Sequence, residues 1–555
     1  GHEHETGHVP TASQNPLVRL QISFERGFEH LRERYHELLA IFLYHRGLFL
    51  IGFLSMALVS LAILMPWLGQ DFFPVVDTGQ FLLHVRAPTG TRIEETARLC
   101  DLIERYIRQQ TPKDVSTTID NIGIPYSGIN LSYSNSGIIG PADADILVTL
   151  TPKHNPTVNC VRKLRLHLPD QFPGVTFSFL PSDIVSQTLN FGLPAPMDIQ
   201  VVGPNQDGNR KFADSLLQKL RNVTGIADLR IQQPFDQPRL NVRVDRTKAQ
   251  EIGFTQRDVA QALLVGLSGS FQTSPTFWLD PKNNVSYQIS TQTPQYWADS
   301  LQDLQNIPVT AASAPSAIIG NLASLHRGTS MAVVSHYNIA SVIDLYAAAE
   351  GRDLGGVSRD IDKIIGANRS KLPRGSEITV RGQVQTMRSS YIGLLGGLAF
   401  SIVLVYLLIV VNFQSWLDPF IMISALPASL AGIAWFLFIT RTTLSVPALT
   451  GSIMCMGVAT SNSILVVSFA TEQMREGKDS LAAALEAGFT RFRPVIMTAL
   501  AMIIGMVPMA LGLGEGGEQN APLGRAVIGG LLFATVATLF FVPTFFSVMH
   551  ARKSR

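Results

Sequence analysis

Apolar and polar residues are distributed very unevenly along this chain. Six segments contain no Asp, Glu, Lys, Arg or His, and they are residues 47–69, 391–411, 420–439, 442–470, 494–514 and 526–549. Each is long enough to cross a hydrocarbon core of about 30 Å as a helix that rises about 1.5 Å per residue. One polar stretch, residues 70–390, separates the first segment from the other five. The pattern predicts a membrane protein with six transmembrane helices in a 1+5 arrangement.

The basic residues lie mostly on one side of this predicted arrangement. Five arginines precede the first apolar segment, four basic residues lie between the fourth and fifth, and three follow the last. The loops on the opposite side hold only Arg441 and Arg525. By the positive-inside rule, both termini are expected in the cytoplasm and residues 70–390 outside, which is the periplasm for a bacterial inner-membrane protein.

The segment before the first apolar span has a helical pattern of its own. Within residues 1–46, apolar side chains recur at three- and four-residue steps from Leu17 to Leu38, with Arg and Glu between them. This spacing predicts an amphipathic helix lying flat at the inner membrane surface. Packing of the same helix on a soluble partner is the alternative.

The outer region repeats one order of strands and helices. The first pass is strand 80–87, helix 92–109, strands 115–122 and 145–151, helix 157–167 and strand 175–180. The second pass is strand 198–202, helix 209–222, strand 226–232, then strand 332–336, helix 354–371 and strand 377–381. The order β-α-β-β-α-β is that of a ferredoxin-like unit. We therefore expect two α+β modules, the second interrupted by an inserted subdomain at residues 245–330.

No motif of an enzyme or of an ATPase is present in the sequence. There is no phosphate-binding loop and no His, Cys or Asp cluster with catalytic or metal-ligand spacing. We therefore expect no enzyme activity, no metal site, no cofactor and no nucleic-acid partner. Methionine is sparse in residues 70–390, which argues against copper or silver export. Cys100 and Cys160 could pair outside the cytoplasm, but two unpaired structural cysteines are the preferred interpretation.

One long loop combines small polar residues with apolar ones. Residues 125–141 read PYSGINLSYSNSGIIGP. A long loop without its own secondary structure is usually functional or disordered, and this one could form an adaptable wall for apolar ligands. The candidate ligand-contacting residues are Tyr126, Ile129, Leu131, Tyr133 and Ile138. An ordinary packed surface loop is the alternative.

Polar residues inside the apolar segments are few. Thr460, Ser461, Asn462 and Ser463 lie in the fourth segment and Thr498 in the fifth. Such side chains often bond between helices as structural contacts. A polar surround for a proton site on a neighbouring repeat is the more specific interpretation. Because an intramembrane acid or base usually marks an ion pathway, we expect this chain to lack part of its machinery.

Several short motifs occur in an order that is specific within this topology. They are Phe73-Pro74 with Asp77 and Gly79, residues 88–96, Asp245-Arg246 with Lys248-Ala249 and Gly253, residues 412–416 before Pro419, residues 457–467, residues 491–498, and Phe541-Val542-Pro543. With these motifs the chain resembles the C-terminal half of a resistance-nodulation-division (RND) efflux permease. Within this family, the chain resembles the hydrophobic and amphiphilic efflux branch, of acriflavine-resistance type.

The resemblance implies a transporter assembled from two repeats. A complete family member is a homotrimer that exchanges protons for amphiphilic small molecules and works with a periplasmic adaptor and an outer-membrane channel. An N-terminal repeat carrying an intramembrane Asp pair would then be required. Many drug pumps have Lys directly before the Asn of the fourth span of this half, where this chain has Ser461 before Asn462. Ser461, Asn462, Thr498 and Arg491 are therefore expected only to support the proton relay.

The resemblance also divides the chain into parts. The expected parts are the segment 1–46, the first helix 47–69, a first porter module 70–195, a second porter module 196–244 and 331–390, a docking subdomain 245–330, five helices 391–549 and a tail 550–555. The expected function is one repeat of a proton-driven efflux transporter that exports hydrophobic and amphiphilic compounds from the periplasm or inner membrane. A non-transporting scaffold or lipid-sensing envelope protein with the same fold is the alternative.

Overall fold

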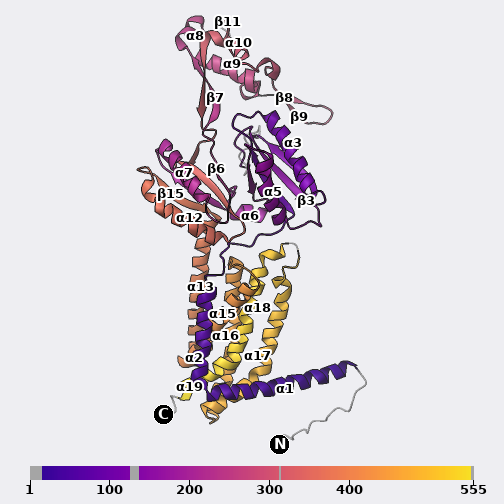
Figure 1. Cartoon of the computed structure of the whole chain (residues 1–555), viewed down its shortest axis with the longest axis vertical. Helices are drawn as coiled ribbons and strands as arrows, with labels where there is room; N and C mark the ends of the chain where they lie inside the picture. The colour runs from indigo at the N-terminus through magenta and orange to yellow at the C-terminus, as the bar shows by residue number, and fades with distance from the viewer. Residues whose placement is uncertain (1–15, 125–136, 312–313, 515, 552–555) are drawn as a thin grey trace. The chain divides into compact units, whose positions relative to one another are not determined.

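The computed structural model describes residues 16–124, 137–311, 314–514 and 516–551 (Figure 1). The chain divides into two compact units. The first comprises Gly1–Ala87, Ile93–Gln232 and Ser335–Arg555, and the second comprises Pro88–Arg92 and Gln233–Val334. The first unit contains the apolar helices and both sheet modules, so every candidate site considered below lies within it.

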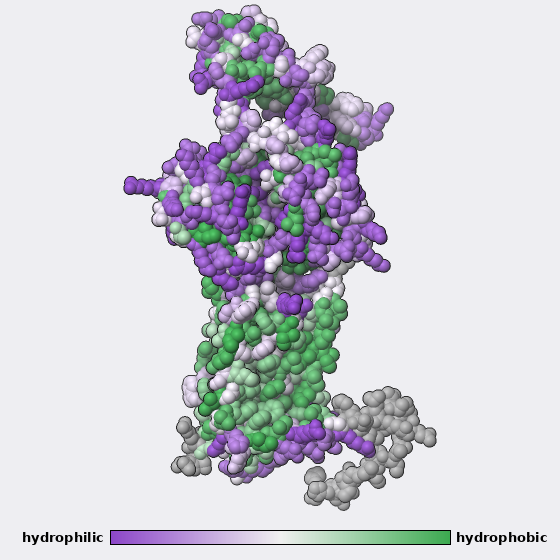
Figure 2. All heavy atoms as spheres, in the orientation of Figure 1, coloured by the Kyte–Doolittle hydropathy of each residue, from purple (hydrophilic) through white to green (hydrophobic). Residues whose placement is uncertain are grey.

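Six helical segments of the described chain are long and apolar enough to cross a membrane. They are α2 (Arg46–Leu64), α13 (Gln383–Phe413), α14 with α15 (Leu417–Ile423, Leu426–Ile439), α16 (Val446–Arg475), α17 (Ser480–Ala510) and α18 continuing through η5 into α19 (Ala521–Val536, Ala537–Phe541, Val542–Ala551). Hydrophobic residues cover the visible face of these helices, whereas the sheet modules are mostly hydrophilic (Figure 2). The helices extend beyond the apolar segments of the sequence and therefore include charged residues at their ends.

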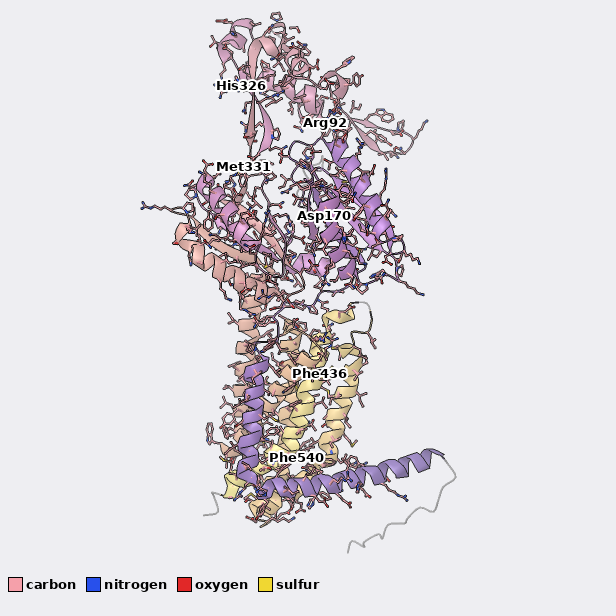
Figure 3. The ribbon with its side chains drawn as sticks, viewed as in Figure 1. Arg92, Asp170, His326, Met331, Phe436 and Phe540 are labelled. Atoms are coloured by element: carbon pink, nitrogen blue, oxygen red, sulfur yellow. The ribbon has the colours of Figure 1, made fainter. Side chains whose placement is uncertain are left out.

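Glycines allow the most enclosed helices to approach one another closely. A Cβ atom added to Gly432 on α15 would lie 2.4 Å from the carbonyl oxygen of Gly529 on α18. A Cβ atom added to Gly529 would lie 2.2 Å from Cβ of Phe436, which lies within the helical bundle (Figure 3). Close backbone approach through small residues is typical of helix packing in membranes.

The first sheet module is a four-stranded antiparallel sheet with two helices. Its elements follow in the order β1 (Gln80–Arg86), α3 (Ile93–Gln110), β2 (Val115–Ile122), β3 (Asp143–Leu150), α5 (Thr157–Gln171) and β4 (Thr176–Leu180), and the strands are ordered β2-β3-β1-β4. Its core includes Leu83, Ile103 and Ile146, which are fully buried. Cys100 and Cys160 are buried and unbonded in the same core.

The second sheet module contains a strand that the sequence analysis missed. Its elements are β5 (Met197–Val202), α7 (Gln206–Leu220), β6 (Ile226–Ile231), β13 (Ser335–Tyr337), β14 (Ala340–Ala349), α12 (Leu354–Asn368) and β15 (Glu377–Gly382), after the short helix α6 (Ile184–Leu189). The expected strand 332–336 was wrong, because β13 is only a short edge and the central strand is β14. In β14, Asp344 and Tyr346 are buried, so polar residues interrupt its apolar pattern.

The second unit has its own small core. It contains β7 (Gln237–Val244), α8 (Arg246–Ile252), α9 (Gln256–Ser268), β8 (Thr276–Leu279), β9 (Ser286–Ile289), α10 (Leu301–Asn306), β10 (Pro308–Ala311), β11 (Ala314–Ile318), α11 (Ile319–Leu322) and β12 (Ala323–Ser330), with 3-10 turns η1 (Ser270–Gln272) and η2 (Gln295–Trp297). Because β7 pairs with β12 from Val244 to Gln237, the unit begins before the expected boundary at residue 245.

The N-terminal helix α1 (Pro16–Tyr44) packs on the helical bundle rather than standing alone. Tyr35 and Leu39 are buried, and the Tyr35 hydroxyl donates a 2.8 Å hydrogen bond to the carbonyl oxygen of Leu539 in η5. The Tyr35 ring lies 5.2 Å from Phe540, which is labelled in Figure 3. Since η5 is a π-helix, it leaves backbone carbonyls that need such partners.

Substitutions at the glycine contact should destabilise the bundle. For Gly529→Ala we expect a loss of about 1–3 kcal/mol, because the new methyl group overlaps Phe436 and the backbone of Gly432. Thermal unfolding of the detergent-solubilised protein checks this. Gly505→Ala on α17 is the control, since nothing lies within 4 Å of its Cβ position. Equal unfolding temperatures for the two variants would contradict the packing described.

Candidate functional site

The first unit contains a cavity with apolar and charged walls. Its volume is about 430 Å³, within the usual range of small-molecule sites. The apolar lining includes Phe72, Phe73, Val75, Val76, Phe81, Phe179, Leu180, Val185 and Leu189, and the charged lining includes Arg165, Asp183, Glu350 and Arg352. Both sheet modules contribute to this lining, together with the segment that follows α2.

The cavity wall is fixed where the chain enters the first module. Asp77 accepts hydrogen bonds from the backbone N–H of Thr157 at 3.0 Å and from its hydroxyl at 2.5 Å. Because Thr157 begins α5, the carboxylate satisfies N–H groups at that helix terminus. This contact holds residues 72–77 against the first module and so defines one side of the cavity.

A layer of buried charges lies between the two sheets. On the first sheet, His84 Nδ1 lies 2.7 Å from Asp145, and Arg86 Nε donates to Asp143 at 2.9 Å. Arg86 Nη1 also donates to the carbonyl oxygen of Gln232 at 3.1 Å, which joins the second module to the first. His84 Nε2 is buried and has no hydrogen-bond partner.

The second sheet places two carboxylates beside each other. The side-chain amide of Gln200 donates to Asp198 at 2.7 Å and to Asp344 at 3.2 Å. Burial raises the pKa of Asp198 to about 8, with a further contribution from the nearby Asp344. On the neighbouring strand, burial lowers the pKa of Arg230 to about 10. Nε and Nη2 of Arg230 have no hydrogen-bond partner. The cleft between the modules is therefore polar as well as apolar.

The predicted ligand loop is seen only at its end. Tyr126, Ile129, Leu131 and Tyr133 lie outside the described residues, whereas Ile138 is described and half-buried. The adjoining Gly137 accepts a 3.0 Å hydrogen bond from the side chain of Gln232. The C-terminal end of the loop therefore adjoins the charged layer between the two sheets.

In the helical bundle, two of the predicted relay residues meet. The Thr498 hydroxyl donates to Oδ1 of Asn462 at 3.0 Å, so α16 and α17 are joined at this point. Ser461 is exposed at the surface of the chain. Arg491 lies elsewhere, with its guanidinium 4.9 Å from the ring of Phe469. The contact between Thr498 and Asn462 joins two helices, and the supporting role of all four residues in a proton relay stays a prediction.

The sequence analysis missed a buried contact between a histidine and an aspartate in the helical bundle. His550 Nε2 lies 3.3 Å from Oδ1 of Asp418, and these residues are 8% and 6% exposed. Both belong to the membrane-length helices, although each lies one or two residues outside the apolar segments of the sequence. The apolar segments contain no titratable group, but the helices extend past them and so include Asp418 and His550. A search for Asp and His at the span ends would have found this pair.

Among the described residues, no group of three or more His, Cys, Asp or Glu side chains is placed to hold a metal ion. The pair of His84 with Asp145 and the pair of Asp198 with Asp344 each offer only two such side chains.

Comparison with known proteins places this architecture in a family. The family model described as AcrB/AcrD/AcrF matches residues 7–550. The chain therefore belongs to the AcrB/AcrD/AcrF family of RND permeases, which confirms the family predicted from the motifs. The heavy metal efflux pump solved in crystal form II has a TM-score of 0.81 and 23% identity, covering 95% of this chain and 52% of that chain. This likeness shows the shared fold.

The relatives of this chain include pumps that are named for different substrates. The cobalt-zinc-cadmium resistance protein CzcA of Cupriavidus metallidurans is 24% identical over 90% of this chain and 47% of its own length. The antibiotic efflux pump membrane transporter ArpB of Pseudomonas putida is 25% identical over 94% of this chain and 48% of its own length. The chain thus spans about half the length of these relatives, and their names do not single out one substrate class.

The buried carboxylate pair makes a pH-dependent stability prediction. Because the pKa of Asp198 is raised on folding, the folded state binds its proton more tightly, and stability falls as pH rises from about 4 towards 8. We expect Asp198→Asn to unfold at a higher temperature than wild type at pH 8 and at a similar temperature at pH 5. Asp214→Asn, at an exposed position on α7, is the control. A parallel pH dependence in wild type and Asp198→Asn would contradict this.

Proposed function

We propose that this chain is one repeat, the C-terminal half, of a proton-driven RND efflux transporter. It exports hydrophobic and amphiphilic compounds from the periplasm or the inner membrane. The chain acts as a transporter component and not as an enzyme. The single observation that carries the proposal is the cavity of about 430 Å³, whose lining combines aromatic and aliphatic side chains with charged ones. An amphiphile presents the same combination of apolar body and polar group.

The length of the relatives supports the need for a second repeat. The chain aligns with 47% of CzcA and 48% of ArpB, so about half of such a pump is outside this sequence. Ser461 is exposed on α16, and that face is available to an N-terminal repeat that carries the intramembrane Asp pair. The complete transporter would be a homotrimer in the bacterial inner membrane with its termini in the cytoplasm. A periplasmic adaptor and an outer-membrane channel would complete the path.

Export of metal ions is the second candidate, since CzcA is named for cobalt, zinc and cadmium resistance. Amphiphiles are favoured because no group of three metal-binding side chains occurs among the described residues. A non-transporting scaffold or lipid-sensing envelope protein is the remaining alternative, and the efflux experiment below distinguishes it from a transporter.

Dye accumulation in a pump-deficient bacterium tests the proposal. The chain is expressed alone, and together with a matching N-terminal repeat, each with and without a protonophore. We expect dye to be expelled only from cells with both repeats, and the protonophore to abolish this. Growth with zinc and cobalt in the same strains tests the metal alternative. Efflux by the chain alone would contradict the half-transporter proposal, and so would an absence of efflux despite membrane assembly of both repeats.

A further inference from the structure

One arginine joins the two sheet modules at the cavity wall. Arg165 lies on α5 of the first module, the helix whose last turn contains Asp170 (Figure 3). Its Nε and Nη2 donate to the two carboxylate oxygens of Asp228 at 3.1 and 2.7 Å. Its Nη1 lies 2.6 Å from Glu350. Asp228 and Glu350 both belong to the second module, so one guanidinium is bound by two carboxylates across the boundary between modules.

The backbone is constrained at both residues that bind Arg165, Asp228 and Glu350. Asp228 has a left-handed backbone with φ of 52°, a conformation that Asp tolerates better than most residues. The backbone N–H of Glu350 donates to the carbonyl oxygen of Gly225 at 2.9 Å. The backbone that carries each carboxylate is therefore constrained, and a planar guanidinium can bind one carboxylate through two N–H groups and the other through a third.

The contact between Arg165 and Asp228 is largely shielded from solvent. The side chain of Asp228 is 4% exposed and that of Arg165 is 22% exposed. The Arg165 guanidinium also lies 4.9 Å from the ring of Phe179, and Phe179, Arg165 and Glu350 all line the cavity. If Arg165 were removed while the modules stayed closed, the buried Asp228 would lose the guanidinium that binds both of its carboxylate oxygens, and a buried charge that loses its partner is strongly destabilising.

We propose that Arg165 is an ionic latch that holds the two sheet modules closed over the cavity, and that its release from Asp228 and Glu350 opens the cavity to substrate. The latch itself is a property of this chain. Its role in admitting substrate rests on the proposed transport function. A transport cycle then alternates between a latched state and an open state in which water and substrate replace the guanidinium contacts.

Double electron–electron resonance on the purified full chain tests the latch. Spin labels at Leu102→Cys on α3 and Gln218→Cys on α7 report the distance between the modules, because both positions are exposed and the native cysteines are buried. In Arg165→Met we expect a longer-distance population that the wild type lacks. Arg162→Met is the matched control, since Arg162 is 52% exposed and makes only a 3.5 Å contact with Glu350.

A second variant tests the same contact through a smaller change, in case Arg165→Met does not fold. Glu350→Gln removes the negative charge of one of the two acceptors and leaves Asp228 paired with Arg165, so it should give a smaller longer-distance population. Elution as a single species and a cooperative thermal unfolding transition identify folded variants. Distance distributions that match wild type in folded Arg165→Met and Glu350→Gln would overturn the latch. The same broadening in Arg162→Met would also overturn it, because the effect would then be unspecific.

Dye efflux distinguishes a failure of the latch proposal from a failure of the proposed transport function. If the two-repeat cells expel dye, Arg165→Met should change the rate severalfold while Arg162→Met does not, and an unchanged rate in Arg165→Met would overturn its role in admitting substrate. If even the wild-type pair expels no dye, the proposed function fails. The longer distances in Arg165→Met would still support the latch as a conformational device of this fold.

Discussion

The arrangement of the first unit depends on one hydrogen-bonded joint where polar chain meets apolar helices. After α2, the backbone of residues 69–72 pairs with the loop before α16: Leu444 donates to Gly69 at 2.8 Å, and Asp71 donates to Leu444 at 3.0 Å. The Tyr391 hydroxyl on α13 donates to the carbonyl oxygen of Leu444 at 2.5 Å. Buried backbone groups need partners, and at this position the joint supplies them.

The same joint holds the beginning of the second module's helix α12. The backbone N–H of Leu354 donates to Asp71 at 2.8 Å, and that of Gln70 donates to Asp353 at 2.9 Å. Burial raises the pKa of Asp71, and the hydrogen bond from Leu354 opposes this rise. Since residues 71–77 also line the cavity, a displacement of α2 or α13 would reach the cavity wall through these bonds. This connection gives a physical route from the apolar helices to the candidate site.

The sequence predicted the elements whose periodicity is undisturbed. The apolar segments coincide with helices, and the predicted strand at residues 115–122 has the observed bounds, because alternation and apolar length are local signals. The central strand β14 was missed because Asp344 and Tyr346 interrupt its apolar pattern, and these same residues belong to the charged layer. The latch was missed for a related reason. Arg165, Asp228 and Glu350 are far apart in the sequence, and only the fold brings them together.

The central claim is that this chain supplies one half of an RND transporter through an exposed face of α16. Native mass spectrometry of the chain, purified from membranes after coexpression with a matching N-terminal repeat as a separate polypeptide, tests it most directly. We expect a complex with equal numbers of both repeats, which dissociates when Ser461 is replaced by Trp. A chain that purifies free of the repeat, or a complex unaffected by Ser461→Trp, would contradict the account.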